Sequence, residues 1–197
     1  MKVLVANLPG VKQNKDGSVK HYVKAGSRWP MTVGNSKSVD YYPFPFWLSY
    51  TSALLKRETQ AHIKGLDGVV HDMDAEDFLE CVKEFKPDLL ITELVILTLE
   101  DDLELLKKIK REISTKIAVG GNYPTTESKS LLMQCDFIDF VFFGEYEFTA
   151  KELVESLLSN SKLVPSQHRE VNYDISPLYE GRDKGVVIKP RRSASVI

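Results

Sequence analysis

The sequence predicts an α/β protein whose doubly wound, five-stranded parallel sheet carries helices on both faces. Five apolar runs of strand length alternate with longer amphipathic segments of helix length. The runs are almost continuously apolar, which is typical of strands buried on both faces of a parallel sheet. Glycine or proline follows several of them, so the chain turns there. Because crossovers between parallel strands are right-handed, we expect the flavodoxin-like (Rossmann-like) strand order.

The first third of the chain holds one strand, one long connection and one helix. The first strand is expected at residues 3–8 and ends at Pro9-Gly10. Residues 10–45 are rich in Gly, Lys, Ser and Asn and show no sustained period, so they predict a long loop. Prolines exclude a helix up to residue 45, and a helix is expected at residues 46–58.

The middle of the chain repeats this alternation. A short second strand is expected at residues 68–71, and Asp74 then caps a helix with apolar residues on one face. The third strand is expected at residues 89–97. The helix after it begins with the acidic residues 100–102 and ends in the basic run 107–111, an order that complements the helix dipole.

Two further strands complete the predicted sheet. The fourth is expected at residues 117–119, ended by Gly120-Gly121, with a short helix near residues 127–133. The fifth is expected at residues 137–143, ended by Gly144. Residues 149–152 match a capping box before the last helix.

Composition limits the class of protein. The 197 residues suffice for one domain with a sizeable core, and contents of 43% apolar and 10% aromatic residues exclude a disordered chain. No apolar run approaches the roughly 18–20 residues that span a bilayer, and the start is too short for a signal peptide. With two cysteines, Cys81 and Cys135, we expect no disulfide framework and a reducing cytoplasm.

Charge is distributed unevenly along the chain, although the formal net charge is −2. Residues 1–60 carry 9 basic and 3 acidic side chains, residues 61–160 carry 10 and 21, and residues 161–197 carry 7 and 4. An acidic body is a poor surface for a polyanion, because nucleic-acid binding needs a basic stripe. The basic cluster at 189–192 is typical of a solvated end, so we expect no nucleic-acid partner.

A site is expected at one edge of the sheet. In an open α/β sheet a ligand binds beyond the carboxyl ends of the strands, at the switch in strand order. Glycines in these turns would let a flat ligand approach the backbone closely. The alternative, that they serve only tight turns, is the commoner role of glycine in loops. The predicted strand ends are residues 7–10, 71–74, 94–98, 120–123 and 144–147.

Several familiar chemistries lack their motifs. The sequence has no Gly-x-Gly-x-x-Gly after the first strand, no P-loop and no Gly-x-Ser-x-Gly, so dinucleotide, P-loop nucleotide and serine-hydrolase sites are not expected. The end of the third strand reads Thr92-Glu93-Leu94-Val95 and offers no aspartate to accept a phosphoryl group. The four histidines are scattered without metal-ligand spacing, so no metal site is expected.

Three groups of motifs carry a family resemblance. The motifs are Arg28-Trp29-Pro30 with Tyr42-Pro43-Phe44-Pro45-Phe46-Trp47-Leu48-Ser49-Tyr50 and Ala53-Leu54-Leu55-Lys56; Pro87-Asp88-Leu89-Leu90-Ile91 with Asp102-Leu103-Glu104 and the Lys-rich end of that helix; and Val119-Gly120-Gly121 with Asp139-Phe140-Val141-Phe142-Phe143-Gly144-Glu145-Tyr146-Glu147. In order and spacing they resemble the N-terminal cobalamin (vitamin B12)-binding domain of cobalamin-dependent radical S-adenosylmethionine enzymes, from Met1 to about residue 160. The double-glycine and Gly-Glu-x-Glu turns are the most specific part.

The resemblance implies cobalamin as the cofactor. Gly120, Gly121 and Gly144 would let the flat corrin approach the edge, and the long first loop would cover its other side. The nucleotide tail would lie between the third and fourth strands, near residues 94–98 and Gly120. The implied cofactor-binding residues are Asn7, Pro9, Arg28, Trp29, Pro43, Phe44, Asp72, Glu93, Leu94, Val95, Thr98, Gly120, Gly121, Asn122, Tyr123, Gly144, Glu145 and Glu147.

The state of the cobalt follows from a missing motif. Cobalamin proteins that place a histidine on cobalt carry Asp-x-His-x-x-Gly, and this chain has none. The resemblance therefore implies base-off cobalamin with no protein histidine ligand. His21, in the long first loop, is the alternative ligand.

Two departures from the family pattern bear on function. Residues 94–97 are apolar where related sequences often have Ser or Thr, which removes hydroxyl hydrogen bonds worth about 0.5–1.5 kcal/mol each. The sequence also lacks Cys-x-x-x-Cys-x-x-Cys, so the [4Fe-4S] cluster and S-adenosylmethionine would belong to a missing half. We expect no catalytic residue in the chain itself.

We therefore expect a truncated product, a fragment or a stand-alone module. Residues 1–160 would form the cobalamin-binding α/β domain, and residues 161–197 a linker or tail toward an absent catalytic domain. The partner would be a radical S-adenosylmethionine domain or separate chain, and the parent enzyme a methyltransferase or an enzyme of related carbon-centred radical chemistry. The alternative is a degenerate flavodoxin-like interaction domain with no cofactor.

Overall fold

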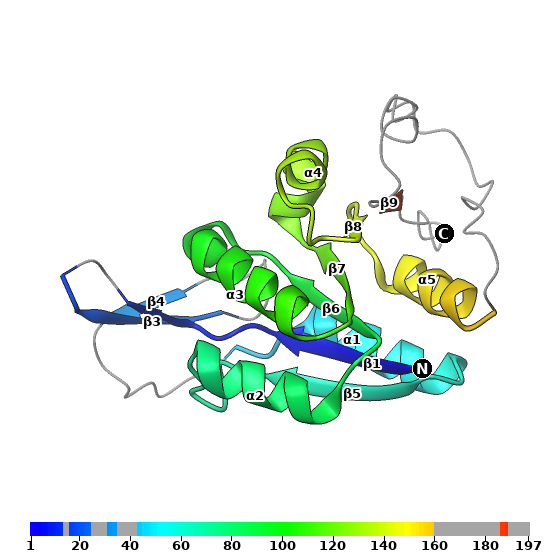
Figure 1. The fold of residues 1–197 in the computed structure, drawn as a ribbon, viewed down its shortest axis with the longest axis horizontal. Helices are drawn as coiled ribbons and strands as arrows, with labels where there is room; N and C mark the ends of the chain where they lie inside the picture. The colour runs from blue at the N-terminus through cyan, green and yellow to red at the C-terminus, as the bar shows by residue number, and fades with distance from the viewer. Residues whose placement is uncertain (14–15, 25–30, 35–42, 160–185, 189–197) are drawn as a thin grey trace, which may run out of the picture.

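The main sheet of the protein is parallel throughout. The computed structural model describes residues 1–13, 16–24, 31–34, 43–159 and 186–188. Six strands lie in the order β5-β1-β6-β7-β8-β9, and every neighbouring pair is parallel (Figure 1). This confirms the doubly wound, flavodoxin-like α/β fold. The strands are β1 (Lys2–Asn7), β5 (His62–Asp67), β6 (Leu89–Glu93), β7 (Lys116–Gly120), β8 (Phe140–Phe142) and β9 (Val186–Ile188).

The sixth strand was not predicted. β9 pairs with β8 and comes from the region that the sequence marks only as a linker or tail. Its three residues are too short a run to be distinguished from a loop by periodicity. The sheet therefore extends one strand further than the five that the apolar pattern indicates.

Helices cover both faces of the sheet, as predicted. Within β6, Leu90 belongs to the core beneath α2, α3 and α4, and its neighbour Ile91 belongs to the core beneath α1 and α5. This alternation explains why β6 is apolar throughout, since each face of the strand is buried. The helices are α1 (Phe46–Glu58), α2 (Ala75–Phe85), α3 (Leu99–Glu112), α4 (Asn122–Gln134) and α5 (Glu147–Ser159).

A second, smaller sheet corrects the prediction of one long loop at residues 10–45. β2 (Val11–Gln13), β3 (Val19–Val23) and β4 (Met31–Gly34) pair antiparallel in that order and extend past the carboxyl end of β1 (Figure 1). Gly10 permits the close contact at its base: the Gly10 carbonyl accepts from the Tyr22 N–H at 2.5 Å, and a Cβ on Gly10 would lie 1.8 Å from the Tyr22 oxygen. These short strands contain many polar residues, so no apolar run predicts them.

The predicted second strand is wrong in position. Residues 68–71 form a turn, and the strand is β5, which ends at Asp67. β5 lies at the edge of the sheet, and its residues are exposed or half-buried. Because β5 contains polar residues such as Lys64, it does not form an apolar run, and the apolar pattern does not predict it.

Other element ends differ by a few residues. β6 stops at Glu93 and is followed by the short 3-10 helix η1 (Ile96–Thr98), so the third strand is shorter than predicted. β8 is likewise shorter, and α4 begins earlier, at Asn122, with a kink at Glu127. The capping box at residue 149 is wrong, because α5 begins at Glu147 and Thr149 is buried within the helix.

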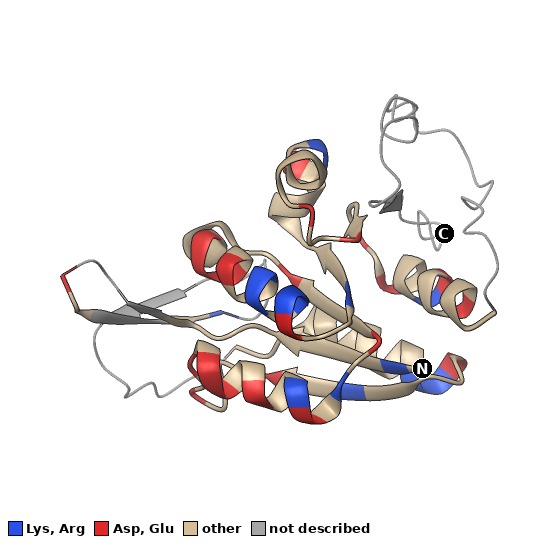
Figure 2. Cartoon of the chain, in the orientation of Figure 1, with Lys and Arg blue, Asp and Glu red and all other residues tan. Residues whose placement is uncertain are grey.

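The start of α2 and the charge order of α3 match the prediction. The Asp74 carboxylate accepts from the backbone N–H groups of Glu76 and Asp77, each at 2.9 Å, and so caps α2. Figure 2 shows acidic side chains at the start of α3 and basic ones toward its end, which complements the helix dipole. None of the helices in the described residues has the length and hydropathy that a membrane span requires.

Candidate functional site

The strand ends place a row of polar and glycine positions along the carboxyl edge of the sheet. Asn7 of β1 pairs with Asp67 of β5, and Glu93 of β6 pairs with Gly120 of β7. Paired residues share a face, and the alternation of each strand directs these positions toward α1 and α5. The edge therefore brings together three predicted residues, Asn7, Glu93 and Gly120.

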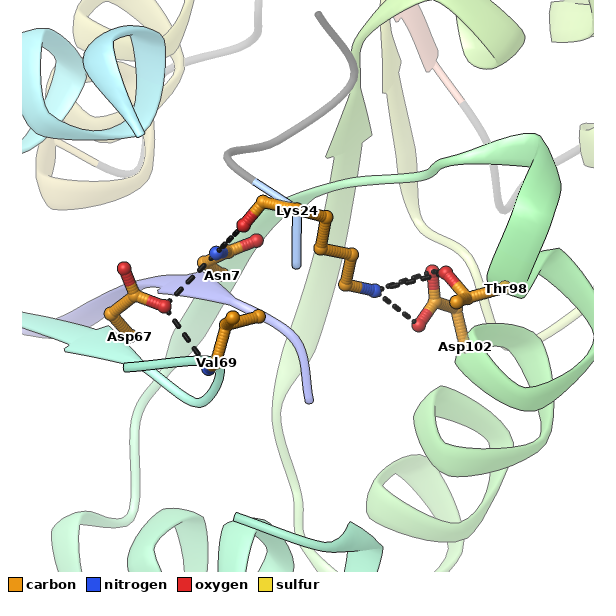
Figure 3. A network of polar contacts seen from close by, with 6 residues as sticks. All are labelled: Asn7, Lys24, Asp67, Val69, Thr98 and Asp102. Carbon is orange, nitrogen blue, oxygen red and sulfur yellow. Dashed lines mark hydrogen bonds and ion pairs between the residues drawn. The ribbon is translucent and has the colours of Figure 1, made fainter. Parts of the chain in front are cut away.

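A buried ion pair lies on this edge, beside β1. The Lys24 ammonium donates to the Asp102 carboxylate at 2.8 and 3.0 Å and to the Thr98 hydroxyl at 3.0 Å (Figure 3). Thr98 in turn donates to Asp102 at 2.8 Å. Lys24 is 1% exposed and Asp102 2%, so the pair is shielded from water. Burial raises the pKa of the Asp102 carboxyl, and the Lys24 charge opposes that shift.

The same network ties the small sheet to the large one. The Asn7 side chain donates to the Lys24 carbonyl at 2.8 Å and to Asp67 Oδ1 at 2.9 Å (Figure 3). Asp67 Oδ1 also accepts from the Val69 N–H at 3.1 Å. Asn7 and Thr98, both predicted to hold a cofactor, are therefore engaged by the protein itself.

Tyr146 covers the other half of this edge. Its hydroxyl donates to Glu93 Oε1 at 3.0 Å, and its ring stacks on Phe142 with a centroid distance of 5.2 Å and an interplanar angle of 2°. A Cβ on Gly120 would lie 3.0 Å from the Tyr146 ring. Burial, then the nearby Glu93 carboxylate, raises the pKa of Tyr146 well above its usual value, so the phenol is neutral. Gly120 thus makes room for a side chain of the protein.

Exposed apolar side chains occur in three segments of the chain near this edge. We call them the apolar rim: Phe44, Phe46 and Tyr50 at the start of α1, Ile96 and Leu97 in η1, and Phe148 at the start of α5. Phe44 and Phe46 meet edge to face at 5.2 Å. Ile96 is 70% exposed. In a parallel sheet the connecting segments leave the carboxyl ends of the strands and the helices run back toward the amino ends, so η1 and the starts of α1 and α5 lie at the carboxyl edge.

The remaining predicted site residues near this edge differ in backbone conformation and in burial. Gly121 has φ 103° and Gly144 φ 71°, so both need glycine for backbone conformation, and the Gly144 N–H donates to Thr125 at 2.9 Å. Asn122 and Glu145 are exposed, and Tyr123 and Glu147 are half-buried. Pro9, Pro43, Leu94 and Val95 are buried.

One predicted residue, Asp72, lies away from the rest of the site. Asp72 is exposed in the turn after β5, and β1, β6 and β7 separate that strand from β8, which leads to Gly144. Arg28 and Trp29 lie outside the described residues. No group of three or more potential metal ligands occurs in the part of the chain that the structure describes.

Sequence reasoning missed the three residues that shape the edge. Lys24 lies in a stretch without a period, and the sequence marks Asp102 as an acid at a helix start and as part of a family motif, with no sign of its partner. Tyr146 occupies the variable position of the Gly-Glu-x-Glu turn, where a large aromatic residue was the one available signal.

The comparison with known families decides the class. The family model for the B12 binding domain matches residues 34–154. The chain belongs to the B12-binding domain family. An uncharacterized methyltransferase of Pyrococcus horikoshii is 29% identical over 121 residues, which are 60% of this chain and 26% of that protein. The chain thus spans about a quarter of this relative's length.

The solved structures include one neighbour of modest similarity. The isolated REC domain of RcsB from Salmonella enterica serovar Typhimurium, in the apo form, aligns with a TM-score of 0.45 and 21% identity. The alignment covers 62% of this chain and 86% of that one. The family assignment rests on the sequence match alone.

The edge fits one part of a cobalamin and not the other. A corrin is broad and flat, and the apolar rim offers exposed aromatic and aliphatic surface at this edge. The space over Gly120, where the resemblance places the nucleotide tail, is filled by Tyr146. The residues present therefore suit the ring and exclude the tail from that space.

Proposed function

We propose that this chain is the cobalamin-binding domain of a radical S-adenosylmethionine-type protein, and that it binds the corrinoid without catalysing a reaction by itself. The match of residues 34–154 to the B12 binding domain carries the proposal. The apolar rim supports it, because a folded protein seldom exposes clustered aromatic and aliphatic side chains without a ligand or partner. Leu97, Phe44 and Gly144 are the residues we expect nearest the ring.

A partner protein would supply the chemistry. Bound cobalamin supports methyl transfer or related chemistry at a carbon centre, and the name of the Pyrococcus relative fits the first of these. We propose a radical S-adenosylmethionine domain, in the same or a separate chain, and a cytoplasmic setting in keeping with two free cysteines. A Cys-x-x-x-Cys-x-x-Cys segment encoded beyond codon 197 or in an adjacent gene would support this partner.

Gel filtration with hydroxocobalamin tests the binding. The protein is mixed with excess hydroxocobalamin and separated from free ligand, and corrinoid absorbance is expected to travel with the protein peak. A matched sample unfolded in urea should emerge colourless. A colourless peak from the folded chain would reject cobalamin binding.

The second candidate function is a degenerate interaction domain without a cofactor. The filling of the space over Gly120 by Tyr146 favours it, since a protein that has lost its ligand is expected to close the vacated space. A colourless protein peak in the same experiment would select this function.

We also propose that bound cobalamin is base-off and carries no protein imidazole. The motif that delivers a histidine to cobalt is missing from the sequence. The absorption spectrum of the complex should therefore be the same for the wild type and His21→Ala. A spectral shift on that substitution would show that His21 ligates the cobalt.

A further inference from the structure

We infer that Tyr146 is a plug that excludes the nucleotide tail of cobalamin, so that the folded chain recognises the corrin ring alone. The inference rests on the proposed corrinoid binding and specifies its ligand: a tail-less corrinoid such as cobinamide should bind as well as complete cobalamin. Three features of the edge support this inference. They are the position of the Tyr146 ring, the contacts that hold this ring, and the separation of the exposed apolar rim from buried Tyr146.

The Tyr146 ring lies where a flat group would rest on the backbone. Gly120 and Glu93 are paired neighbours on β7 and β6, and both point toward α1 and α5. A Cβ added to Gly120 would lie 3.0 Å from both Cδ1 and Cε1 of Tyr146. An aromatic base cannot contact Gly120 unless this ring leaves.

The ring is held by several contacts at once. It stacks parallel on Phe142, and its hydroxyl donates to Glu93 at 3.0 Å. Tyr146 is 2% exposed and Glu93 4%, so displacing the ring would also remove a hydrogen bond from a buried carboxylate. An entering base would need to replace all of these contacts.

The space that the ring fills is itself suited to an aromatic base. Tyr146 belongs to an apolar cluster with Val5, Ile91, Ala118 and Phe142. Removal of the Tyr146 ring would leave a space within this cluster, beside Phe142 and Gly120, and apolar cavities bind small aromatic molecules. Truncation of Tyr146 should therefore create a site for the tail.

The apolar rim does not depend on the plug. Ile96, Leu97 and Phe44 are exposed, whereas Tyr146 and its cluster are buried. The ring-binding surface can thus be present while the tail site is closed. Because the two surfaces are separate, a substitution of Tyr146 should change the affinity for the nucleotide tail and leave the affinity for the corrin ring unchanged.

The test compares two ligands and four proteins. Dissociation constants for hydroxocobalamin and for diaquocobinamide, which lacks the nucleotide tail, are measured by equilibrium dialysis with the full chain. For the wild type, the dissociation constants of the two ligands should agree within about threefold. Tyr146→Ala should tighten cobalamin binding by about tenfold, the effect of burying roughly two methylene groups, and leave cobinamide unchanged.

Two controls separate the plug from other effects. Tyr146→Phe keeps the ring and removes the donor to Glu93, so its ratio of the two constants should equal that of the wild type. Leu153→Ala opens a cavity in the same core, two turns further along α5, and should not favour cobalamin. Circular dichroism checks the fold of each variant.

Each outcome decides the inference. Wild-type binding of cobalamin tenfold or more above cobinamide would overturn the plug and leave the proposed function standing. Binding of cobalamin by Tyr146→Ala alone would uphold the plug and reject the proposed function for the wild type. Absence of corrinoid binding to every folded variant would reject both. The ratio of the two dissociation constants for the wild type requires no variant. It therefore tests the plug even if Tyr146→Ala fails to fold.

Discussion

The adjacent glycines 120 and 121 are required for different physical reasons. Gly121 has φ 103° and ψ −170°, a conformation that is essentially restricted to glycine. Gly120 has no such restriction, but a side chain there would strike the Tyr146 ring. Neither requirement involves a ligand. If a Gly121 variant lost corrinoid binding, the strained backbone would therefore explain the loss without any contact between Gly121 and the ligand.

Gly121→Ala is expected to lower the free energy of unfolding by about 1–3 kcal/mol, because alanine is strained at this φ. Urea denaturation measures the change. Gly65→Ala is the matched control: it lies in β5, and its Cβ would meet its nearest neighbour, Ser52 Oγ, at an ordinary 3.7 Å. Equal costs for the two substitutions would contradict the role assigned to the Gly121 backbone.

Tyr146 should give the protein a measurable sensitivity to alkali. Its pKa is raised in the folded state by burial and by Glu93, whereas the unfolded phenol titrates near pH ~10. Its stabilising contribution is thus complete below pH ~10 and is lost as the pH rises toward the folded pKa. The difference in unfolding free energy between wild type and Tyr146→Phe should narrow above pH ~10, by up to about 1.4 kcal/mol per pH unit. Parallel pH profiles would show that the phenol is not buried as described.

At the scale of elements, one lysine joins the small sheet to the large sheet and to α3. Lys24 follows β3 directly, its carbonyl accepts from Asn7 of β1, and its ammonium pairs with Asp102 of α3. These polar contacts join the small sheet to β1 and to α3. A charge left alone in that place would be costly, because it is shielded from water.

Lys24→Met is expected to cost about 3–5 kcal/mol of unfolding free energy, since it leaves the Asp102 carboxylate buried without its cation. The double variant Lys24→Met/Asp102→Leu should recover much of that loss, because no unpaired charge remains. A double-mutant cycle by urea denaturation gives the coupling. Strictly additive costs would mean that the ion pair does not stabilise the junction.

At the scale of the whole molecule, the parallel sheet assembles the apolar rim from distant segments. The starts of α1 and α5 and the 3-10 helix η1 lie far apart in sequence. They lie at one edge because parallel strands all end there, and the helices return from that same edge. The rim is thus a product of topology, and its residues contribute little to the core.

Ile96→Ser combined with Leu97→Ser should weaken corrinoid binding about tenfold or more and change stability by less than about 1 kcal/mol, since both side chains are exposed. Equilibrium dialysis with cobinamide measures the first effect and urea denaturation the second. Met133→Ser is the control, because Met133 is 59% exposed, between Ile96 at 70% and Leu97 at 42%, but lies near the far end of α4. Equal loss of binding in both variants would place the ligand elsewhere.

The sequence by itself determined the layered α/β architecture. Continuous apolar runs identified β1, β6 and β7, because these central strands are buried on both faces. The proline-led start of α1 and the Asp74 cap of α2 are local signals and were read correctly. The turn glycines 121 and 144 were likewise visible, because backbone conformation leaves a mark in the sequence.

Only the tertiary structure decided what occupies the edge. Lys24 meets Asp102 across 78 residues, and Tyr146 meets Glu93 across 53. The edge strand β5 and the small sheet β2-β3-β4 likewise depend on pairing with partners that no local period announces. Contacts of this kind depend on how strands and helices are packed, and a single sequence records each residue without its partner. The apolar pattern of this sequence therefore predicts the fold. The filling of the space over Gly120 by Tyr146 is visible only in the tertiary structure, because the fold brings these two residues together.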